Sequence, residues 1–117
     1  MKKENENLIV KLSFEFALEI ITYSENLEEH KKYIIARQLL KSGTSIGANV
    51  REAQNAESKA DFIHKMKIAA KEADETDYWL TLCELSPTYP KPEGLKEKLN
   101  SIVNIISKII ITSKSNQ

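Results

Sequence analysis

The sequence predicts an all-α protein that folds as an up-down-up-down four-helix bundle. Apolar residues recur at alternating steps of three and four in four separate segments, and short polar or proline-rich stretches separate these segments. The β-branched residues gather in the last segment, where their spacing is helical and does not alternate as in a strand. We expect one domain over residues 1–117, with helices at about 5–25, 32–55, 59–85 and 93–112.

The helix expected at 5–25 carries one apolar seam that would face the core. The seam is formed by Ile9, Ser13, Phe16, Ile20, Tyr23 and Leu27. Residues 28–31 form a polar turn of the length that joins antiparallel helices. The second helix should therefore return alongside the first.

The helices expected at 32–55 and 59–85 are joined by a very short turn, and each has its own seam. The first seam is Ala36, Leu39, Gly43, Ile46, Val50 and Ala53, and the second is Phe62, Met66, Ala69, Ala73, Thr76, Leu80 and Cys83. Ser58 is the expected N-cap of the third helix, with Asp61 in the position of a capping-box acid. Two seams across a tight turn predict an αα-hairpin.

Two glycines within the second helix predict a close approach between backbones. Glycine inside a helix costs roughly 0.5–1 kcal/mol relative to alanine, so two in one helix need a packing reason. Antiparallel pairing across the hairpin places Gly47 opposite Met66 and Gly43 opposite a layer of small residues. That layer is Ala69, Ala70 and Ala73. A helix break at Gly43 is the alternative, but the seam keeps its phase across both glycines, which favours a continuous helix.

Three prolines between residues 87 and 92 end the third helix, and a fourth helix follows. Its seam is Leu95, Leu99, Ile102, Ile106 and Ile109. A second apolar face, formed by Val103, Ile105, Ile110 and Ile111, is wider than one bundle core requires. It predicts self-association through this helix or through the first one. The polar tail from Thr112 onward is expected to fray.

The 17 basic and 17 acidic residues balance, so composition alone does not imply strong non-specific nucleic-acid binding. A local basic face remains in the first half of the third helix. The candidate nucleic-acid-binding residues there are Lys59, Lys65, Lys67 and Lys71. The alternative is that these lysines are only exposed charges that keep the surface of the helix hydrated.

The N-terminus, the apolar stretches and the single cysteine all favour a cytoplasmic location. The N-terminus is polar and lacks a signal-peptide pattern, and no apolar stretch reaches the 18 residues of a membrane span. Cys83 falls on a seam, which predicts a buried structural thiol and not a nucleophile. We therefore expect a cytoplasmic protein without a membrane partner.

No set of residues predicts a reaction centre. Asp61 and His64 form one imperfect acid-x-x-His pair, whereas a di-iron bundle needs two Glu-x-x-His motifs with two further carboxylates. Gly43 and Gly47 do not form a phosphate-binding loop, because the lysine and the preceding strand are missing. We expect no catalytic residue, no metal site and no cofactor.

A polar set on the two hairpin helices has two interpretations. The set is Arg37, Asn49, Arg51, Glu52, Glu72 and Glu75. Antiparallel pairing would bring Arg37 near Glu75 and Lys41 near Glu72. The set could bind a partner, or it could supply inter-helix hydrogen bonds and solvated charge. We favour the structural interpretation, because charged residues are mostly exposed.

Three segments of the hairpin resemble a known family. They are QLLKSGTSIGANVREA at 38–53, SKADF at 58–62 and IAAKEADETDYWL at 68–80. In these segments the chain resembles the four-helix-bundle proteins encoded in 23S rRNA intervening sequences, which are often labelled ribosomal proteins. The likeness covers nearly the whole chain and is specific in its middle third, while the first and fourth helices match only in character.

The resemblance implies a small left-handed bundle that assembles as a ring-like homopentamer. Related accessory proteins of diversity-generating retroelements are pentamers that bind reverse transcriptase and nucleic acid. No catalytic residues are known for the family. We therefore expect a non-enzymatic homo-oligomer that binds RNA, DNA or a nucleic-acid enzyme. The alternative is a protein-binding or structural homo-oligomer with no nucleic-acid role.

Overall fold

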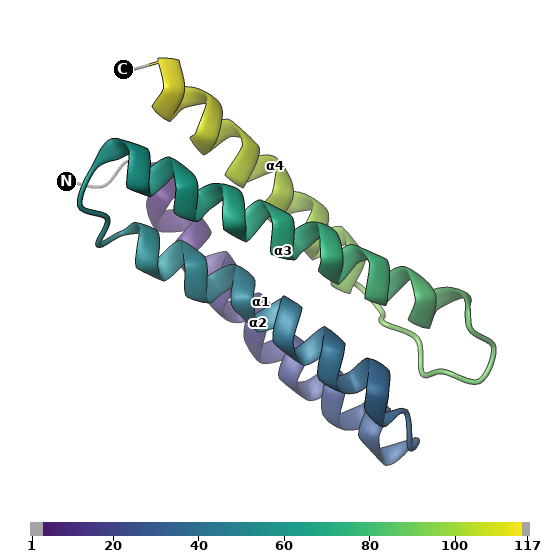
Figure 1. Ribbon diagram of the computed structural model, residues 1–117. Helices are drawn as coiled ribbons and strands as arrows, with labels where there is room; N and C mark the ends of the chain where they lie inside the picture. The colour runs from purple at the N-terminus through teal and green to yellow at the C-terminus, as the bar shows by residue number, and fades with distance from the viewer. Residues whose placement is uncertain (1–3, 116–117) are drawn as a thin grey trace.

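The computed structural model describes residues 4–115 as four helices with no strand among them. The helices are α1 (Glu4–Glu29), α2 (Tyr33–Ala53), α3 (Lys59–Leu85) and α4 (Leu95–Ser115). Figure 1 shows that each helix runs antiparallel to the next along a rod, which measures 49 × 21 × 18 Å. Contacts join α1 to α2, α2 to α3, α3 to α4 and α4 to α1, so α1 and α3 lie on opposite corners. The all-α four-helix bundle predicted from the sequence is confirmed.

The seams form the core almost as predicted. Every seam residue expected on α1, α2 and α4 is buried. On α3 the seam holds from Met66 to Cys83, but Phe62 is only partly buried and packs against the edge of the core. Its neighbour Ile63 is buried instead. The three-four spacing therefore located the core, with one exception in the first turn of α3.

The turn that joins α1 to α2 begins later than predicted, because α1 continues to Glu29 and does not end near residue 25. Lys31 then adopts a left-handed conformation with φ of 62°. The Lys32 N–H donates to the Leu27 carbonyl at 2.8 Å, which satisfies one of the last helical carbonyls as in a Schellman motif. Nothing in 26–29 breaks a helix, since glycine and proline are absent there.

The remaining helix ends follow local hydrogen bonding. Ser58 caps α3 as predicted, because its hydroxyl accepts from the Asp61 N–H at 3.0 Å. The start of α4 is at Leu95 and not at residue 93, since Gly94 has a φ of 78° that is incompatible with a helix. Fraying of the tail from Thr112 stays a prediction, and its last residues, 116–117, lie outside the described residues, but α4 extends beyond the predicted end at about residue 112. The helix continues to Ser115, whose hydroxyl donates to the carbonyls of its own last turn.

The two glycines of α2 mark a close contact, but with a different helix from the one expected. A Cβ on Gly43 would lie 2.8 Å from Cγ2 of Ile20, and one on Gly47 would lie 3.1 Å from the carbonyl oxygen of Ser13. Both neighbours belong to α1. The expected partners on α3, which were Ala69, Ala70 and Ala73 for Gly43 and Met66 for Gly47, are therefore wrong as the nearest neighbours. The prediction paired α2 only with α3, across the short turn between them, whereas α2 also packs against α1.

A buried polar contact joins α2 to α3. The hydroxyls of Ser42 and Thr76 are hydrogen-bonded at 2.9 Å, and both side chains are fully buried. Thr76 also bonds to the carbonyl of Glu72 within its own helix at 2.7 Å. A directional contact inside an apolar core favours one register of α2 against α3. None of the four helices within 4–115 has the length and apolarity needed to cross a membrane.

Candidate nucleic-acid interface

Two lysine side chains meet across the α3–α4 contact at one end of the rod. Because α4 runs antiparallel to α3, its last turn lies at the end where α3 begins (Figure 1). The Lys67 amine on α3 lies close enough to Lys114 on α4 to lower the pKa of Lys114, through the interaction of the two amines and their charge repulsion. Both side chains are exposed. We call this pair, together with Lys71, the basic patch.

Lys71 extends the patch along α3. It lies one helical turn after Lys67 and is exposed. Within residues 4–115, Lys67, Lys71 and Lys114 form no ion pair with a carboxylate. Three ammonium groups without a paired acid make a local positive charge on a chain whose net charge is zero.

The four lysines expected to bind nucleic acid do not form one group. Lys65 points to α2, where it pairs with Glu52 at 3.2 Å. Lys67 points to the other side of α3, toward α4. Lys59 is exposed at the first residue of α3. Of the expected group, Lys67 and Lys71 therefore remain as members of the basic patch.

Lys114 was not singled out from the sequence. It was assigned to a frayed tail, whereas α4 includes it. Antiparallel pairing of α3 with α4 could have identified it, in the same way that pairing was used for α2 and α3. The tertiary neighbour of Lys67 is thus 47 positions away in the chain.

Two members of the inter-helix polar set make side-chain contacts within their own helix. The Asn49 amide donates to the Ser45 carbonyl at 2.8 Å, and Glu75 accepts from the Trp79 indole at 3.1 Å. Glu52 is the member that bridges two helices, through its ion pair with Lys65. The expected pairs of Arg37 with Glu75 and of Lys41 with Glu72 do not form within residues 4–115. Arg51 instead borders a groove between α1 and α2.

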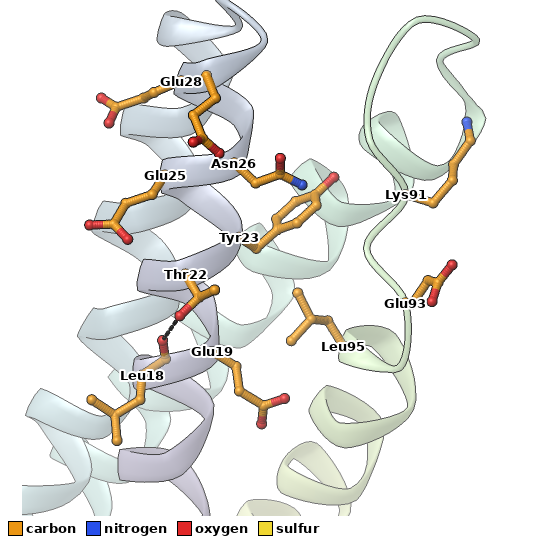
Figure 2. A pocket seen from close by; sticks show the side chains of 11 residues that line it. Leu18, Glu19, Thr22, Tyr23, Glu25, Asn26, Glu28, Lys91, Glu93 and Leu95 are labelled. Atoms are coloured by element: carbon orange, nitrogen blue, oxygen red, sulfur yellow. Dashed lines mark hydrogen bonds between the residues drawn. The ribbon is translucent and has the colours of Figure 1, made fainter.

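A shallow hollow of about 1090 Å³ lies between the end of α1 and the loop that precedes α4. Figure 2 shows Tyr23 and Asn26 pointing toward that loop, while the Glu25 and Glu28 carboxylates point away from it. The Tyr23 hydroxyl donates to the Pro90 carbonyl at 2.6 Å and fastens the loop to α1. Glu19, on the same wall, pairs with Lys98. The hollow has an acidic rim and no nucleophile next to a base.

The buried titratable groups do not form a reaction centre either. Burial raises the pKa of the Tyr23 phenol and of the adjacent Cys83 thiol, so both stay neutral. His64 is exposed, and His30, in the turn after α1, contacts the Asn26 carbonyl through Nδ1 at 2.9 Å. Across the described part of the chain, no group of three or more His, Cys, Asp or Glu side chains is placed to hold a metal ion.

Comparisons with known proteins agree with this architecture. The family model described as 23S rRNA-intervening sequence protein matches residues 5–111. A crystal structure at 1.70 Å of a protein with unknown function from the S23 ribosomal protein family of Bacteroides thetaiotaomicron is similar with a TM-score of 0.84 and 40% sequence identity. The match covers 91% of this chain and 97% of that one. No curated protein matches the chain.

Proposed function

The chain belongs to the family of 23S rRNA-intervening sequence proteins, and from this premise we propose that it is a non-enzymatic homo-oligomer that binds nucleic acid through the basic patch. The contacts would be made mainly to phosphates, because lysine is a compact point charge without the planar fork by which arginine makes specific bidentate contacts. Only two arginines occur in the chain, against fifteen lysines. Binding should therefore tolerate different sequences.

The grouping of Lys67, Lys71 and Lys114 on the neighbouring helices α3 and α4, all exposed and without an ion pair within residues 4–115, supports the proposal. Two ammonium groups that repel each other and lack a paired acid within residues 4–115 are electrostatically unfavourable. A phosphate oxygen between them would offset the repulsion by two attractive contacts. The site is exposed, so each contact would be weak and screened by salt.

Self-association would let several weak binding sites act together and so raise the overall affinity for nucleic acid. Each subunit of a homo-oligomer repeats the basic patch, and the family resemblance favours five subunits. Once one patch is bound, the others act at a high local concentration of phosphate, which can raise the overall affinity by roughly 10²–10⁴. Oligomer formation and nucleic-acid binding are therefore coupled in this proposal.

A structural or protein-binding homo-oligomer is the second candidate. Exposed large apolar side chains on α1 and α3, among them Phe14 and Leu85, support it because such residues commonly contact another protein. This candidate requires no role for the basic patch. It becomes the leading one if the experiment below detects no binding.

The test is fluorescence anisotropy with labelled structured RNA and duplex DNA at low salt. We expect wild-type protein to bind both, and the Lys67→Glu, Lys114→Glu double variant to lose at least tenfold in affinity while keeping its oligomeric state. The matched control is Lys41→Glu with Lys108→Glu, which changes the net charge equally at two exposed lysines outside the patch. Equal losses in both double variants would mean that total charge, and not the patch, governs binding.

A further inference from the structure

An apolar groove of about 310 Å³ runs between α1 and α2. Its walls include Phe14 and Ala17 from α1 and Gly47 and Ala48 from α2. Gly47 hollows the groove, since it presents no side chain and lies against the Ser13 backbone. Lys11 and Arg51 border the groove and give its rim a positive charge.

The apolar surface continues beyond the groove. Phe14 is 57% exposed, Leu18 is 52% exposed and Ile21 is 39% exposed. These three are spaced by four and three residues, so they lie along one side of α1. Leu40 on the neighbouring α2 is also exposed. We call these four residues, with the groove, the α1/α2 face.

A matching apolar ridge lies on α3. Tyr78, Leu82 and Leu85 are again spaced by four and three, and they are exposed by 58%, 36% and 74%. The carboxylates of Asp74 and Glu75 lie one turn before the ridge and are exposed. We call Tyr78, Leu82 and Leu85 the α3 ridge. It is an apolar strip with acidic neighbours, whereas the groove within the α1/α2 face is bordered by the cations Lys11 and Arg51.

We propose that the α1/α2 face of one subunit receives the α3 ridge of a second copy of this chain. Charge complementarity supports this occupant, because Lys11 and Arg51 border one surface and acids accompany the other. The lengths also correspond, since Phe14 and Ile21 are seven positions apart and so are Tyr78 and Leu85, about 10 Å along a helix.

The position of the two surfaces decides the type of assembly. Because α1 and α3 lie on opposite corners of the bundle, the contact joins two different surfaces. Such a heterologous contact leaves one free surface of each kind on every dimer, so further subunits can add, and a ring forms where the rotation between subunits closes. The inference rests on the homo-oligomer in the proposed function and specifies its contact surfaces.

Helix α4 does not supply the interface in this proposal, although its extra apolar residues first suggested it. Val103, Ile105 and Ile110 are partly buried and pack against the chain's own core. Ile111 alone of that group is largely exposed, at 66%. A single exposed isoleucine does not form a contact surface of the usual size.

The experiment uses one variant for each surface, measured by light scattering after size exclusion. Phe14→Asp places a carboxylate in the α1/α2 face, and Leu85→Asp places one on the α3 ridge. Both positions are exposed, so far-UV circular dichroism should show folded protein. We expect wild type to be an oligomer and each variant to elute as a single chain of 13.3 kDa. Ile111→Asp is the control and should remain an oligomer.

Mixing the two monomeric variants is the decisive step. Phe14→Asp keeps an intact ridge and Leu85→Asp keeps an intact face, so one intact contact can form between them. We expect a 1:1 complex of two chains that does not grow further. Failure of the mixture to associate, a monomeric wild type, or dissociation caused by Ile111→Asp would overturn the proposal. An oligomer that behaves as expected but binds no RNA or DNA leaves this inference standing and removes only the nucleic-acid role.

Discussion

Gly43 of α2 lies so close to Ile20 of α1 that a Cβ on Gly43 would be 2.8 Å from Cγ2 and 2.9 Å from Cγ1 of Ile20. Carbon atoms normally pack at about 3.5–4.0 Å, so the two helices would have to separate or Ile20 would have to shift. Both atoms are close to the α1 backbone and cannot swing away easily. The absence of a side chain at Gly43 therefore sets the distance between α1 and α2 at this level.

We predict that Gly43→Ala destabilises the protein by about 1–3 kcal/mol in urea melts, because it overpacks the core. On an unhindered helix surface the same change would stabilise by up to about 1 kcal/mol. Lys41→Ala, at an exposed position of the same helix, should change stability by less than about 0.5 kcal/mol. In an Ile20→Ala background the cost of Gly43→Ala should disappear, and a stabilised Gly43→Ala in wild type would contradict the packing.

The buried hydroxyls of Ser42 and Thr76 should be energetically coupled. Thr76→Val keeps the shape of the side chain and removes the hydrogen-bond partner of Ser42. We therefore expect the free energy of unfolding to fall by about 1 kcal/mol. Ser42→Ala should cost a similar amount. Because removing both partners leaves no unsatisfied group, the double variant should cost less than the sum.

A double-mutant cycle from urea melts measures this coupling. Thr22→Val is the matched control, because Thr22 is exposed and bonds only to the Leu18 carbonyl of its own helix. It should cost less than about 0.5 kcal/mol. Strict additivity of Ser42→Ala and Thr76→Val would show that the two hydroxyls do not interact.

Tyr23 should make the protein less stable at high pH. An unfolded tyrosine ionises near pH 10, whereas burial raises the pKa of Tyr23 in the folded state. The unfolded state therefore releases a proton first, and the stability present below about pH 10 is lost as the pH rises further. In Tyr23→Phe this loss should be smaller by up to about 1.4 kcal/mol per pH unit.

Urea melts between pH 7 and pH 11 test the prediction. At neutral pH, Tyr23→Phe should be less stable by about 1 kcal/mol, because the hydrogen bond to the Pro90 carbonyl is lost. Parallel curves for wild type and Tyr23→Phe would mean that Tyr23 does not titrate differently in the two states.

The sequence predicted the elements of the fold well because the seams are strictly periodic. Ile9 to Leu27 on α1 and Leu95 to Ile109 on α4 are buried in the expected order. The Ser58 cap was predictable for the same reason, since it depends on residues three apart in the chain. Local spacing was therefore sufficient for the helices and their core faces.

Relations between residues on different helices were harder to predict. Gly43 was paired with α3 across the shorter turn, although its closest neighbour is Ile20 on α1. Lys114 was missed because its significance depends on Lys67 in another helix. In a bundle each helix has two neighbours, and the phase of one seam does not say which neighbour a flanking residue contacts.

The salt dependence of nucleic-acid affinity tests the central claim most directly. If Lys67, Lys71 and Lys114 each contact a phosphate, one subunit engages about three, and log K against log[salt] for duplex DNA should fall with a slope of roughly −3 or steeper when several subunits bind. The Lys67→Glu, Lys114→Glu variant should give a much shallower slope, while Lys41→Glu with Lys108→Glu should not. No detectable binding by wild type at low salt, or an affinity that salt does not change, would contradict the proposed function.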